Sequence, residues 1–226
     1  MSKFGEEYFE RGVGSLYTSY REKMIAVFKS NYLPRVVRDI HIFKGMKVLD
    51  IGCAYGLFLK LIEELGAETY GVDISGYAIE RARKETRATL YLHDVEKGLP
   101  MFPDGLFDLV TMFDVIEHLS SPFYVLREVL RVLKPRGKMI VTSPNLNAVG
   151  RYIRKLLRQE AEWYGYRDAT HLYLFTPASL RFLVERSGFN VVRVETPFHP
   201  LPKILQKIAD KTGLGGQIWL VAEKPE

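Results

Sequence analysis

Short β-rich runs alternate with helical stretches from residue 47 onward, and this alternation limits the folds that the chain can adopt. Strands separated by helices pair side by side in parallel, and the connecting helices cover both faces of the sheet. The pattern therefore predicts an α/β fold built on one sheet. The predicted strands are Lys47–Ile51, Thr69–Asp73, Ala88–His93, Phe107–Phe113, Gly137–Thr142, Asn190–Glu195 and Gln217–Ala222. The predicted helices are Gly56–Leu65, Ser75–Glu85, Phe123–Leu133 and Pro177–Ser187.

Composition narrows the class of protein. Of the 226 residues, 47% are hydrophobic and 26% are charged, a mixture that builds a buried core and excludes wholesale disorder. The single cysteine, Cys53, excludes an internal disulfide framework and a multi-cysteine zinc site. The first residues lack the apolar core of a signal peptide, and no run of 18 apolar residues occurs. We therefore expect a cytoplasmic protein.

The net charge of +5 is spread unevenly. Residues 1–44 carry 8 basic and 5 acidic side chains, residues 45–144 carry 12 and 14, and residues 145–226 carry 12 and 8. The excess of positive charge thus lies in the flanks and leaves the centre slightly acidic. A basic surface of this kind suits nucleic acid, an anionic lipid surface or an acidic small substrate, and the charge alone leaves all three open.

The strongest local motif is a strand that runs into a glycine-bearing turn and then a helix. Lys47–Ile51 leads directly into the turn from Gly52 to Gly56. Such a turn lets a ligand approach the backbone closely, and the free N–H groups of the following helix favour an anionic group. Asp73 ends the next strand, 21 positions after Gly52, at about the spacing from which an acidic side chain reaches ribose hydroxyls. The motif predicts a nucleoside-bearing cofactor.

The glycine pattern indicates which cofactor this is. A nicotinamide-binding GxGxxG would need glycines where Ala54 and Leu57 stand. What remains is GxxxG from Gly52 to Gly56, preceded by Asp50, and no lysine follows where a phosphate-binding loop needs one. A cofactor with a ribose and an amino-acid tail suits this turn better than one with phosphates.

Five motifs in order now carry a resemblance. VLDIGCAYG, GVDIS, HDVEKGLP, FPDGLFDLVTMFDVIEHLSSP and LREVLRVLKPRGKMIVTSPN resemble class I S-adenosylmethionine-dependent methyltransferases, in particular the small-molecule branch with the ubiquinone-biosynthesis O-methyltransferases. The resemblance spans about residues 46–195. It implies a Rossmann-like, seven-stranded, mostly parallel sheet whose last strand is antiparallel, and S-adenosyl-L-methionine as cofactor.

The resemblance also implies roles for individual residues. The strand end and turn from Asp50 to Gly56 would hold the methionine end of the cofactor, Asp73 would grip the ribose hydroxyls, and Ile74 would lie against the adenine. Asp94 would meet the adenine amino group. The whole implied cofactor-binding set is Asp50, Gly52, Cys53, Ala54, Gly56, Asp73, Ile74, Asp94, Val95 and Phe113. One departure is Ala54, which replaces the usual middle glycine of the turn.

Plainer explanations stay open for several of these residues. Gly52 and Gly56 could simply make a tight turn, Asp73 could be a charge at a helix N-terminus, and Asp94 could be a loop residue. Cys53 is expected to be a small apolar filler and not a nucleophile, because nothing basic neighbours it in sequence.

An oxygen acceptor must lose a proton during methyl transfer, so a positioned base is expected. The candidate catalytic residues are His118, directly after the fourth predicted strand, and His171, in an aromatic stretch; structural hydrogen bonding is the alternative for each. Asp114, Glu117 and His118 resemble the cluster with which some quinone-synthesis O-methyltransferases bind a divalent metal. A solvated loop explains them equally well, and no metal is predicted.

We expect a single domain over residues 1–226, with a cofactor-binding core at 45–144. Residues 1–44 would form an N-terminal helical cap, and residues 145–175 and 196–213 would be inserts that build the acceptor pocket. The insert at 145–175 contains a basic amphipathic stretch, with Leu156 and Leu157 on the apolar face and Arg154 and Arg158 opposite. A second such stretch, residues 202–211, would permit peripheral contact with anionic membranes.

The predicted function is transfer of a methyl group from S-adenosylmethionine to a small molecule, at oxygen more than nitrogen, with an anionic or lipid-linked acceptor. One alternative is an RNA or protein methyltransferase with the same cofactor, although the FDVIEH loop lacks the NPPY-type sequence that holds a flipped base. The other alternative is a non-catalytic cofactor-binding scaffold. The oligomeric state is not predicted.

Overall fold

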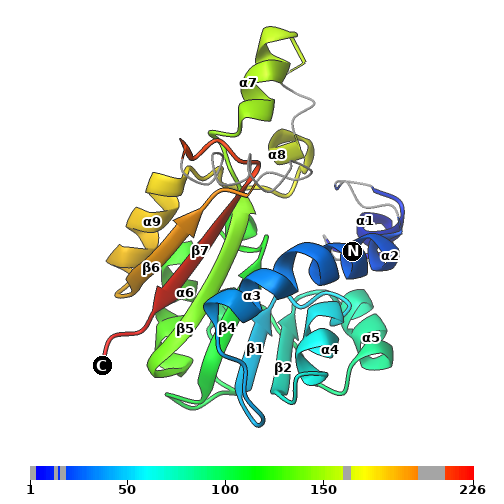
Figure 1. Cartoon of the computed structure of the whole chain (residues 1–226). Helices are drawn as coiled ribbons and strands as arrows, with labels where there is room; N and C mark the ends of the chain where they lie inside the picture. The colour runs from blue at the N-terminus through cyan, green and yellow to red at the C-terminus, as the bar shows by residue number, and fades with distance from the viewer. Residues whose placement is uncertain (1–3, 13–14, 16–18, 160–163, 198–211) are drawn as a thin grey trace.

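The centre of the computed structural model is a seven-stranded sheet in the order β3-β2-β1-β4-β5-β7-β6 (Figure 1). The structure describes residues 4–12, 15, 19–159, 164–197 and 212–226. The strands are β1 Lys47–Ile51, β2 Glu68–Asp73, β3 Thr89–Leu92, β4 Phe107–Phe113, β5 Leu133–Pro144, β6 Asn190–Glu195 and β7 Gln217–Glu223. β1 to β5 pair in parallel, whereas β7 is antiparallel to both β5 and β6. The predicted fold class is confirmed, including the antiparallel last strand.

Four longer helices connect the strands, and two of them begin at a side-chain cap. They are α4 Leu57–Glu63, α5 Gly76–Glu85, α6 Pro122–Val132 and α9 Pro177–Arg186. The hydroxyl of Ser75 accepts a hydrogen bond from the backbone N–H of Ala78 at the start of α5. At the start of α9, Thr176 as N-cap and Ser179 at the third helical position form a capping box, with Pro177 as the first helical residue.

The period of two along each strand sorts the core into two layers. Buried side chains such as Val48, Leu109 and Trp219 face α4 and the N-terminal helices. Their sequence neighbours, such as Leu49 and Val110, face α6 and α9 on the other side of the sheet. Strands that are apolar on both faces are what a sheet covered by two helical layers requires.

The fifth strand begins earlier than its sequence predicts. Leu133, expected to be the last residue of a helix, instead pairs with Phe107 as the first residue of β5. The register then shifts before Leu109 pairs with Lys138, and Arg136 takes a positive φ of 63° in this irregular stretch. The pattern missed the extension because Lys134 to Gly137 has no apolar alternation.

The segments outside the alternation lie in two places. The described part of residues 1–44 contains α1 Glu6–Glu10, α2 Tyr20–Val27, a π-helix Phe28–Tyr32 and α3 Leu33–Asp39. After β5 come α7 Val149–Leu156 and α8 Tyr164–Arg167, and Figure 1 shows α1, α7 and α8 on the side where the parallel strands end. In contrast, α2, the π-helix and α3 pack on the face of the sheet that α4 covers. Most of the predicted insert at 196–213, including the basic stretch 202–211, lies outside the described residues. None of the described helices is long and apolar enough to cross a membrane.

Candidate active site

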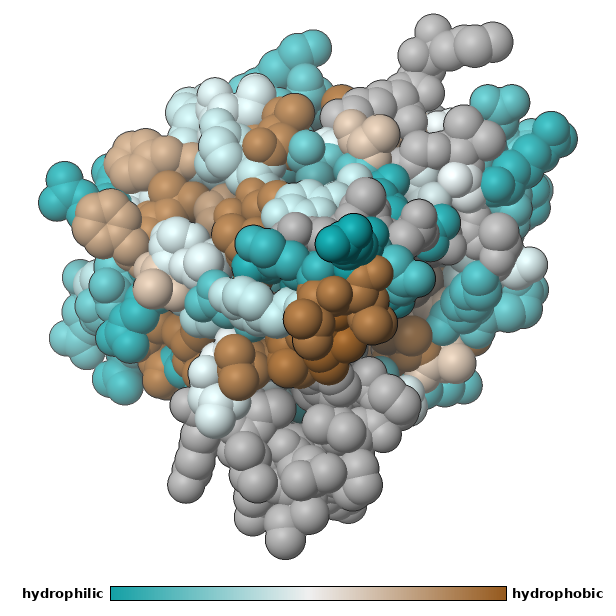
Figure 2. Space-filling view, turned by 90° about the horizontal axis from the view of Figure 1, so that it is seen from above, coloured by the Kyte–Doolittle hydropathy of each residue, from teal (hydrophilic) through white to brown (hydrophobic). Residues whose placement is uncertain are grey.

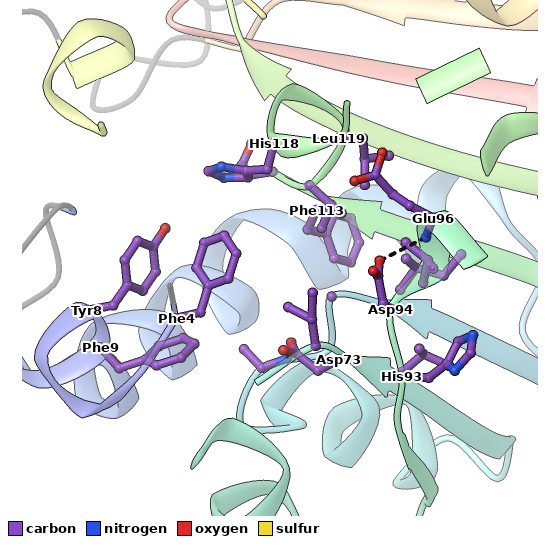
Figure 3. A pocket seen from close by; sticks show the side chains of 18 of the residues that line it. Phe4, Tyr8, Phe9, Asp73, His93, Asp94, Glu96, Phe113, His118 and Leu119 are labelled. Atoms are coloured by element: carbon purple, nitrogen blue, oxygen red, sulfur yellow. Dashed lines mark hydrogen bonds between the residues drawn. The ribbon is translucent and has the colours of Figure 1, made fainter. Parts of the chain in front are cut away.

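A pocket opens at the carboxyl ends of β1, β2 and β4, beside the point where the strand order reverses around β1. This is the place where open α/β sheets bind their ligands. Figure 3 shows the pocket between α1 on one side and the strand ends on the other. Its lining consists of Phe4, Tyr8, Phe9, Tyr20, Ile51, Gly52, Ala54, Val72, Asp73, Ile74, His93, Asp94, Val95, Glu96, Phe113, Asp114, Val115, His118 and Leu119.

The turn after β1 is held tightly against the pocket. The backbone N–H groups of Gly52 and Cys53 both donate to the carbonyl of Val72, at 2.8 and 3.1 Å. Gly52 has a φ of +72°, and a Cβ there would lie 2.3 Å from a methyl carbon of Val115. Only glycine fits this position. Ala54, which replaces the usual glycine, is also left-handed at φ +46°, so the departure seen in the sequence places a strained residue in the turn.

Asp73 fixes the turn to the next helix. Its carboxylate accepts one hydrogen bond from the N–H of Ala54 at 2.8 Å and one from the N–H of Ser75 at 2.7 Å. Burial raises the pKa of Asp73, and the hydrogen bonds from Ser75 and Ala54 oppose that shift. Asp73 therefore serves as an N-terminal anchor for α5 while also lining the pocket.

The residues expected at the adenine end line the pocket together. Asp94 caps the short 3₁₀ helix Val95–Lys97, because its Oδ1 accepts from the N–H of Glu96 at 3.0 Å (Figure 3). Ile74 is 50% exposed, which leaves an apolar side chain open to a planar ligand. The plain explanation for Asp73, a charge at a helix N-terminus, is thus realised at a residue that also faces the pocket. Asp94 is more than a loop residue, because it caps a short helix and faces the pocket as well.

Three of the ten implied cofactor residues do not line the pocket. The carboxylate of Asp50 turns to the hydroxyl of Thr111, 2.6 Å away, and burial raises its pKa to about 7. Cys53 is buried in a small cluster with Leu59 and Ile79, and burial raises the pKa of its thiol, as expected of a filler. Gly56 is the N-cap of α4 at φ +66° and shapes the turn only.

The wall facing these strand ends comes from the N-terminal segment. Phe4 and Phe9 line the pocket with Tyr8 and Tyr20, and the hydroxyl of Ser75 donates to the backbone carbonyl of Phe4 at 2.5 Å. Sequence reasoning identified an aromatic helical cap at 1–44 but named none of these residues. No spacing signal links them to the strand ends, because the contact joins parts of the chain about 70 positions apart.

His118 lines the pocket on the side opposite the cofactor turn, and His171 lies behind it. The two ring centroids are 4.8 Å apart. Nδ1 of His118 lies 2.9 Å from the hydroxyl of Thr170, which itself donates to Asp168 at 2.5 Å. The Asp168 carboxylate also accepts from the hydroxyl of Tyr8 at 3.0 Å, so it connects the segment around residue 170 with α1.

Glu117 lies beneath the two histidines and is fully buried. Neither of its carboxylate oxygens has a hydrogen-bond partner in the described part of the chain. Burial raises the pKa of Glu117 well above its usual range, and the charge of Asp114 adds to this. The Glu117 backbone carbonyl accepts from the N–H groups of Leu172 and Tyr173, at 2.8 and 3.1 Å, which brings His171 alongside.

The cluster implied by resemblance, Asp114 with Glu117 and His118, does not form as a unit. The Asp114 carboxylate instead accepts from the Gln217 amide at 2.9 Å, the Thr142 hydroxyl at 3.0 Å and the Tyr32 hydroxyl at 3.2 Å. Asp114 has a φ of +55°, and this strained backbone turns its side chain toward β5 and β7.

Comparisons with known proteins agree with this geometry. The family model for the methyltransferase domain matches residues 18–194. The ubiquinone biosynthesis O-methyltransferase of Maricaulis maris is 30% identical over 196 residues, 81% of this chain and 73% of that protein. The mitochondrial enzyme of the same name from Schizosaccharomyces pombe is 29% identical over 130 residues, 54% of this chain, and the match spans only 47% of that protein.

Among solved structures, a SAM-dependent methyltransferase from Archaeoglobus fulgidus superimposes with a TM-score of 0.66 at 25% identity, covering 97% of both chains. The matched family range contains the turn from Gly52 to Gly56 and both acidic residues of the pocket, Asp73 and Asp94. The chain belongs to the class I S-adenosylmethionine-dependent methyltransferases.

Proposed function

We propose that this methyltransferase transfers the methyl group to an oxygen of a small, anionic or lipid-linked molecule. One observation carries the proposal: a single pocket runs from Gly52, Asp73 and Asp94 to the ring of His118. A cofactor seated at the acidic end would direct its reactive end toward the histidine. The relatives named as ubiquinone biosynthesis O-methyltransferases support the choice of oxygen.

The cofactor end would be held by backbone and carboxylate groups. When bound, S-adenosylmethionine supplies a methyl group on a positively charged sulfur. Gly52 lets the ligand approach the turn, Asp73 offers its carboxylate to the ribose hydroxyls, and Ile74 and Val95 present apolar surface to the adenine. Asp94 would accept from the adenine amino group. Asp50 would act from behind the turn, because its carboxylate is bonded to Thr111 and does not line the pocket.

The acceptor end would be formed by Phe113, His118 and the aromatic residues of α1. Phe113 packs between Tyr32 and Phe58, with ring centroids 4.8 Å from each, so its position is fixed. A rigid aromatic wall can orient an acceptor and exclude water, which is the main task in methyl transfer. His118 would act on the acceptor hydroxyl, and His171 would act through its contact with His118.

α7 supports an anionic or lipid-linked acceptor. It has no buried residue, and Leu156 and Leu157 are 84% and 62% exposed. Arg154 and Lys155 are exposed in its last turn, and Arg158 is exposed just after its C-cap, Leu157. Figure 2, which looks onto this end of the molecule, shows hydrophobic and hydrophilic surfaces side by side. A basic helix with an exposed apolar face is suited to the surface of an anionic bilayer, from which a lipid-linked acceptor could enter.

The test measures formation of S-adenosylhomocysteine with three acceptor classes: phenols with and without a polyprenyl tail, RNA, and a protein lysate. We expect turnover with the phenols alone. Asp73→Ala should bind S-adenosylmethionine at least about tenfold more weakly by calorimetry, since a hydrogen bond to a charged group contributes about 1.5–3 kcal/mol. Asp104→Ala, an exposed acid outside the pocket, is the control. Turnover only with RNA or protein would overturn the proposal.

A further inference from the structure

Four carboxylate side chains line the cofactor pocket, and they belong to Asp73, Asp94, Glu96 and Asp114. Within the described ranges no lysine or arginine lines it, so two histidines are its basic side chains there. A cleft lined mainly by one sign of charge raises the local concentration of ligands of the opposite sign. The lining therefore suits a ligand that carries a positive charge.

The wall opposite the strand ends is aromatic. The N-terminal segment contributes four described side chains to the lining, and each is an aromatic ring: Phe4, Tyr8, Phe9 and Tyr20. Leucine or isoleucine would cover a pocket equally well through the hydrophobic effect alone. An aromatic face adds partial negative charge, which attracts a cation within about 6 Å of the ring centroid. The aromatic wall and the acidic lining thus favour the same kind of ligand.

Phe4 contacts both sides of the pocket. Its backbone carbonyl accepts a hydrogen bond from the hydroxyl of Ser75, just after β2, at 2.5 Å. Its ring lies nearly perpendicular to that of His118, beyond β4, with the two centroids 5.7 Å apart. Figure 3 shows the Phe4 ring between Tyr8 and Phe113. Because Phe4 is held from two sides, its ring keeps a defined place at the pocket.

Tyr8 stands beside Phe4 and is anchored separately. The two ring centroids are 5.0 Å apart, and the ring planes lie at 87° to each other. The Tyr8 hydroxyl donates to the carboxylate of Asp168 at 3.0 Å. Perpendicular packing sets the edge of one ring against the face of the other, which fixes the orientation of both. Two aromatic rings are thus preorganised at the pocket, which lowers the cost of ordering them around a ligand.

S-adenosylmethionine and the product of its reaction differ in charge at one atom. The donor, when bound, brings a positively charged sulfur, whereas S-adenosylhomocysteine has a neutral thioether there. A wall that only excludes water would hold both ligands alike, but aromatic rings beside an acidic lining prefer the charged one. We infer that Phe4 and Tyr8 recognise the positive charge of the methyl donor and make the pocket selective for S-adenosylmethionine over S-adenosylhomocysteine.

This selectivity promotes release of the product. Methyl transfer breaks the bond between the methyl group and sulfur and leaves its electron pair on sulfur, which becomes neutral. Phe4 and Tyr8 then lose their attraction to the sulfur and keep only apolar contact with the product. The selectivity concerns the methyl donor, so it goes beyond the proposed function and does not depend on the acceptor. An anionic group on the acceptor would meet the exposed Arg154 and Lys155 of α7, outside this pocket.

The experiment compares three ligands by calorimetry on the full chain. They are S-adenosylmethionine, S-adenosylhomocysteine and sinefungin, which carries a protonated amine in place of the methylated sulfur. The readout is the dissociation constant of S-adenosylhomocysteine divided by that of S-adenosylmethionine, because a general loosening of the pocket weakens both ligands and cancels in this ratio. For the wild type we expect a ratio of at least about five, and sinefungin should bind about as tightly as S-adenosylmethionine.

Replacing either ring by an aliphatic side chain should lower this ratio. Phe4→Leu and Tyr8→Leu keep apolar volume but lose the ring, and each should reduce the ratio by about two- to fivefold, the effect of one cation–π contact that keeps some solvent. Phe4→Tyr and Tyr8→Phe keep the ring and should leave the ratio unchanged, even where the affinity for both ligands falls. Phe43→Leu, at an exposed ring outside the pocket, is the control and should also keep the ratio.

A second measurement needs no variant. The isotope-labelled methyl group of S-adenosylmethionine is followed by NMR on the wild-type chain, and ring currents from nearby aromatic faces should shift its resonance upfield on binding. The inference would be overturned by a wild type that binds S-adenosylhomocysteine as tightly as S-adenosylmethionine, or by sinefungin that binds like S-adenosylhomocysteine. Leucine variants that keep the wild-type ratio, or a bound methyl resonance without an upfield shift, would overturn it as well.

Discussion

The hydroxyl of Tyr8 donates a hydrogen bond to the carboxylate of Asp168 at 3.0 Å, across 160 positions of sequence. This bond joins the N-terminal wall of the pocket to the segment that carries Thr170 and His171. Asp168 also receives hydrogen bonds from the N–H and the hydroxyl of Thr170, at 2.8 and 2.5 Å. One carboxylate therefore connects the N-terminal aromatic wall of the pocket with the segment that carries Thr170 and His171.

We predict that Tyr8→Phe makes the N-terminal wall of the pocket more mobile while keeping the aromatic ring in place. The ring stays, but one hydrogen bond to the Asp168 carboxylate is lost, and a hydrogen bond to a charged group contributes about 1.5–3 kcal/mol. We expect S-adenosylmethionine to bind about five- to tenfold more weakly by calorimetry, with a modest fall in the melting temperature. Tyr124→Phe, a hydroxyl deletion outside this pocket, is the matched control. Equal affinity of Tyr8→Phe and the wild type for S-adenosylmethionine would show that the Tyr8–Asp168 hydrogen bond does not position the N-terminal wall of the pocket.

Gly52→Ala should abolish tight cofactor binding. The added Cβ would lie 2.3 Å from Val115, and the φ of +72° disfavours any side chain, so the turn must move. We expect the affinity for S-adenosylmethionine to fall by more than about tenfold and stability to fall by about 1–3 kcal/mol. Gly45→Ala separates the two causes, because Gly45 has a similar φ of +81° with nothing within 4 Å of its Cβ. That control should lose stability alone. Unchanged cofactor binding in Gly52→Ala would contradict the close approach at this turn.

Asp50 should make stability depend on pH. Burial raises its folded-state pKa from 3.8 to about 7, with a smaller contribution from the charge of Asp73, and the Thr111 hydroxyl opposes the shift. Because the folded pKa lies above the unfolded one, the folded state binds the proton more tightly. The contribution of Asp50 is therefore fully present below about pH 4 and is lost as the pH rises through about 7.

The measurement is urea unfolding of the wild type and Asp50→Asn from pH 4 to 8. The amide that replaces the carboxylate carries no charge at any pH in this range, and its oxygen can still accept from Thr111. We expect the variant to lose less stability than the wild type over this range, by a few kcal/mol at most. Glu80→Gln, on the exposed face of α5, should follow the wild-type curve. Parallel curves for Asp50→Asn and the wild type would contradict a raised pKa.

The sequence was sufficient for the sheet but not for the walls of the pocket. Strands such as β1 and β4 are apolar on both faces, so they can be recognised in the sequence as short continuous apolar runs. The glycine turn and Asp73 then indicate the cofactor end of the sheet. The contact of Tyr8 with Asp168 has no such signal, because one hydroxyl and one carboxylate 160 positions apart form no pattern. His118 and His171 were predicted separately as catalytic residues. Their packing against each other over the buried Glu117 depends on tertiary hydrogen bonds from Leu172 and Tyr173.

α7 yields the last prediction, that this helix carries the chain to anionic bilayers. The apolar side chains at its C-terminal end are exposed, and so are the basic Arg154 and Lys155 of its last turn; both kinds of side chain contribute at a headgroup layer. The wild-type chain should co-sediment with vesicles that contain phosphatidylglycerol. Added salt should weaken this binding, because it screens the attraction between the basic side chains and the anionic lipids. The double variant Leu156→Asp, Leu157→Asp should bind at least about tenfold more weakly, since two apolar side chains no longer enter the interface. The matched double variant Leu65→Asp, Val192→Asp, at exposed positions away from α7, should bind like the wild type. Equal loss in both double variants would show that added negative charge, and not the apolar face of α7, governs the attachment.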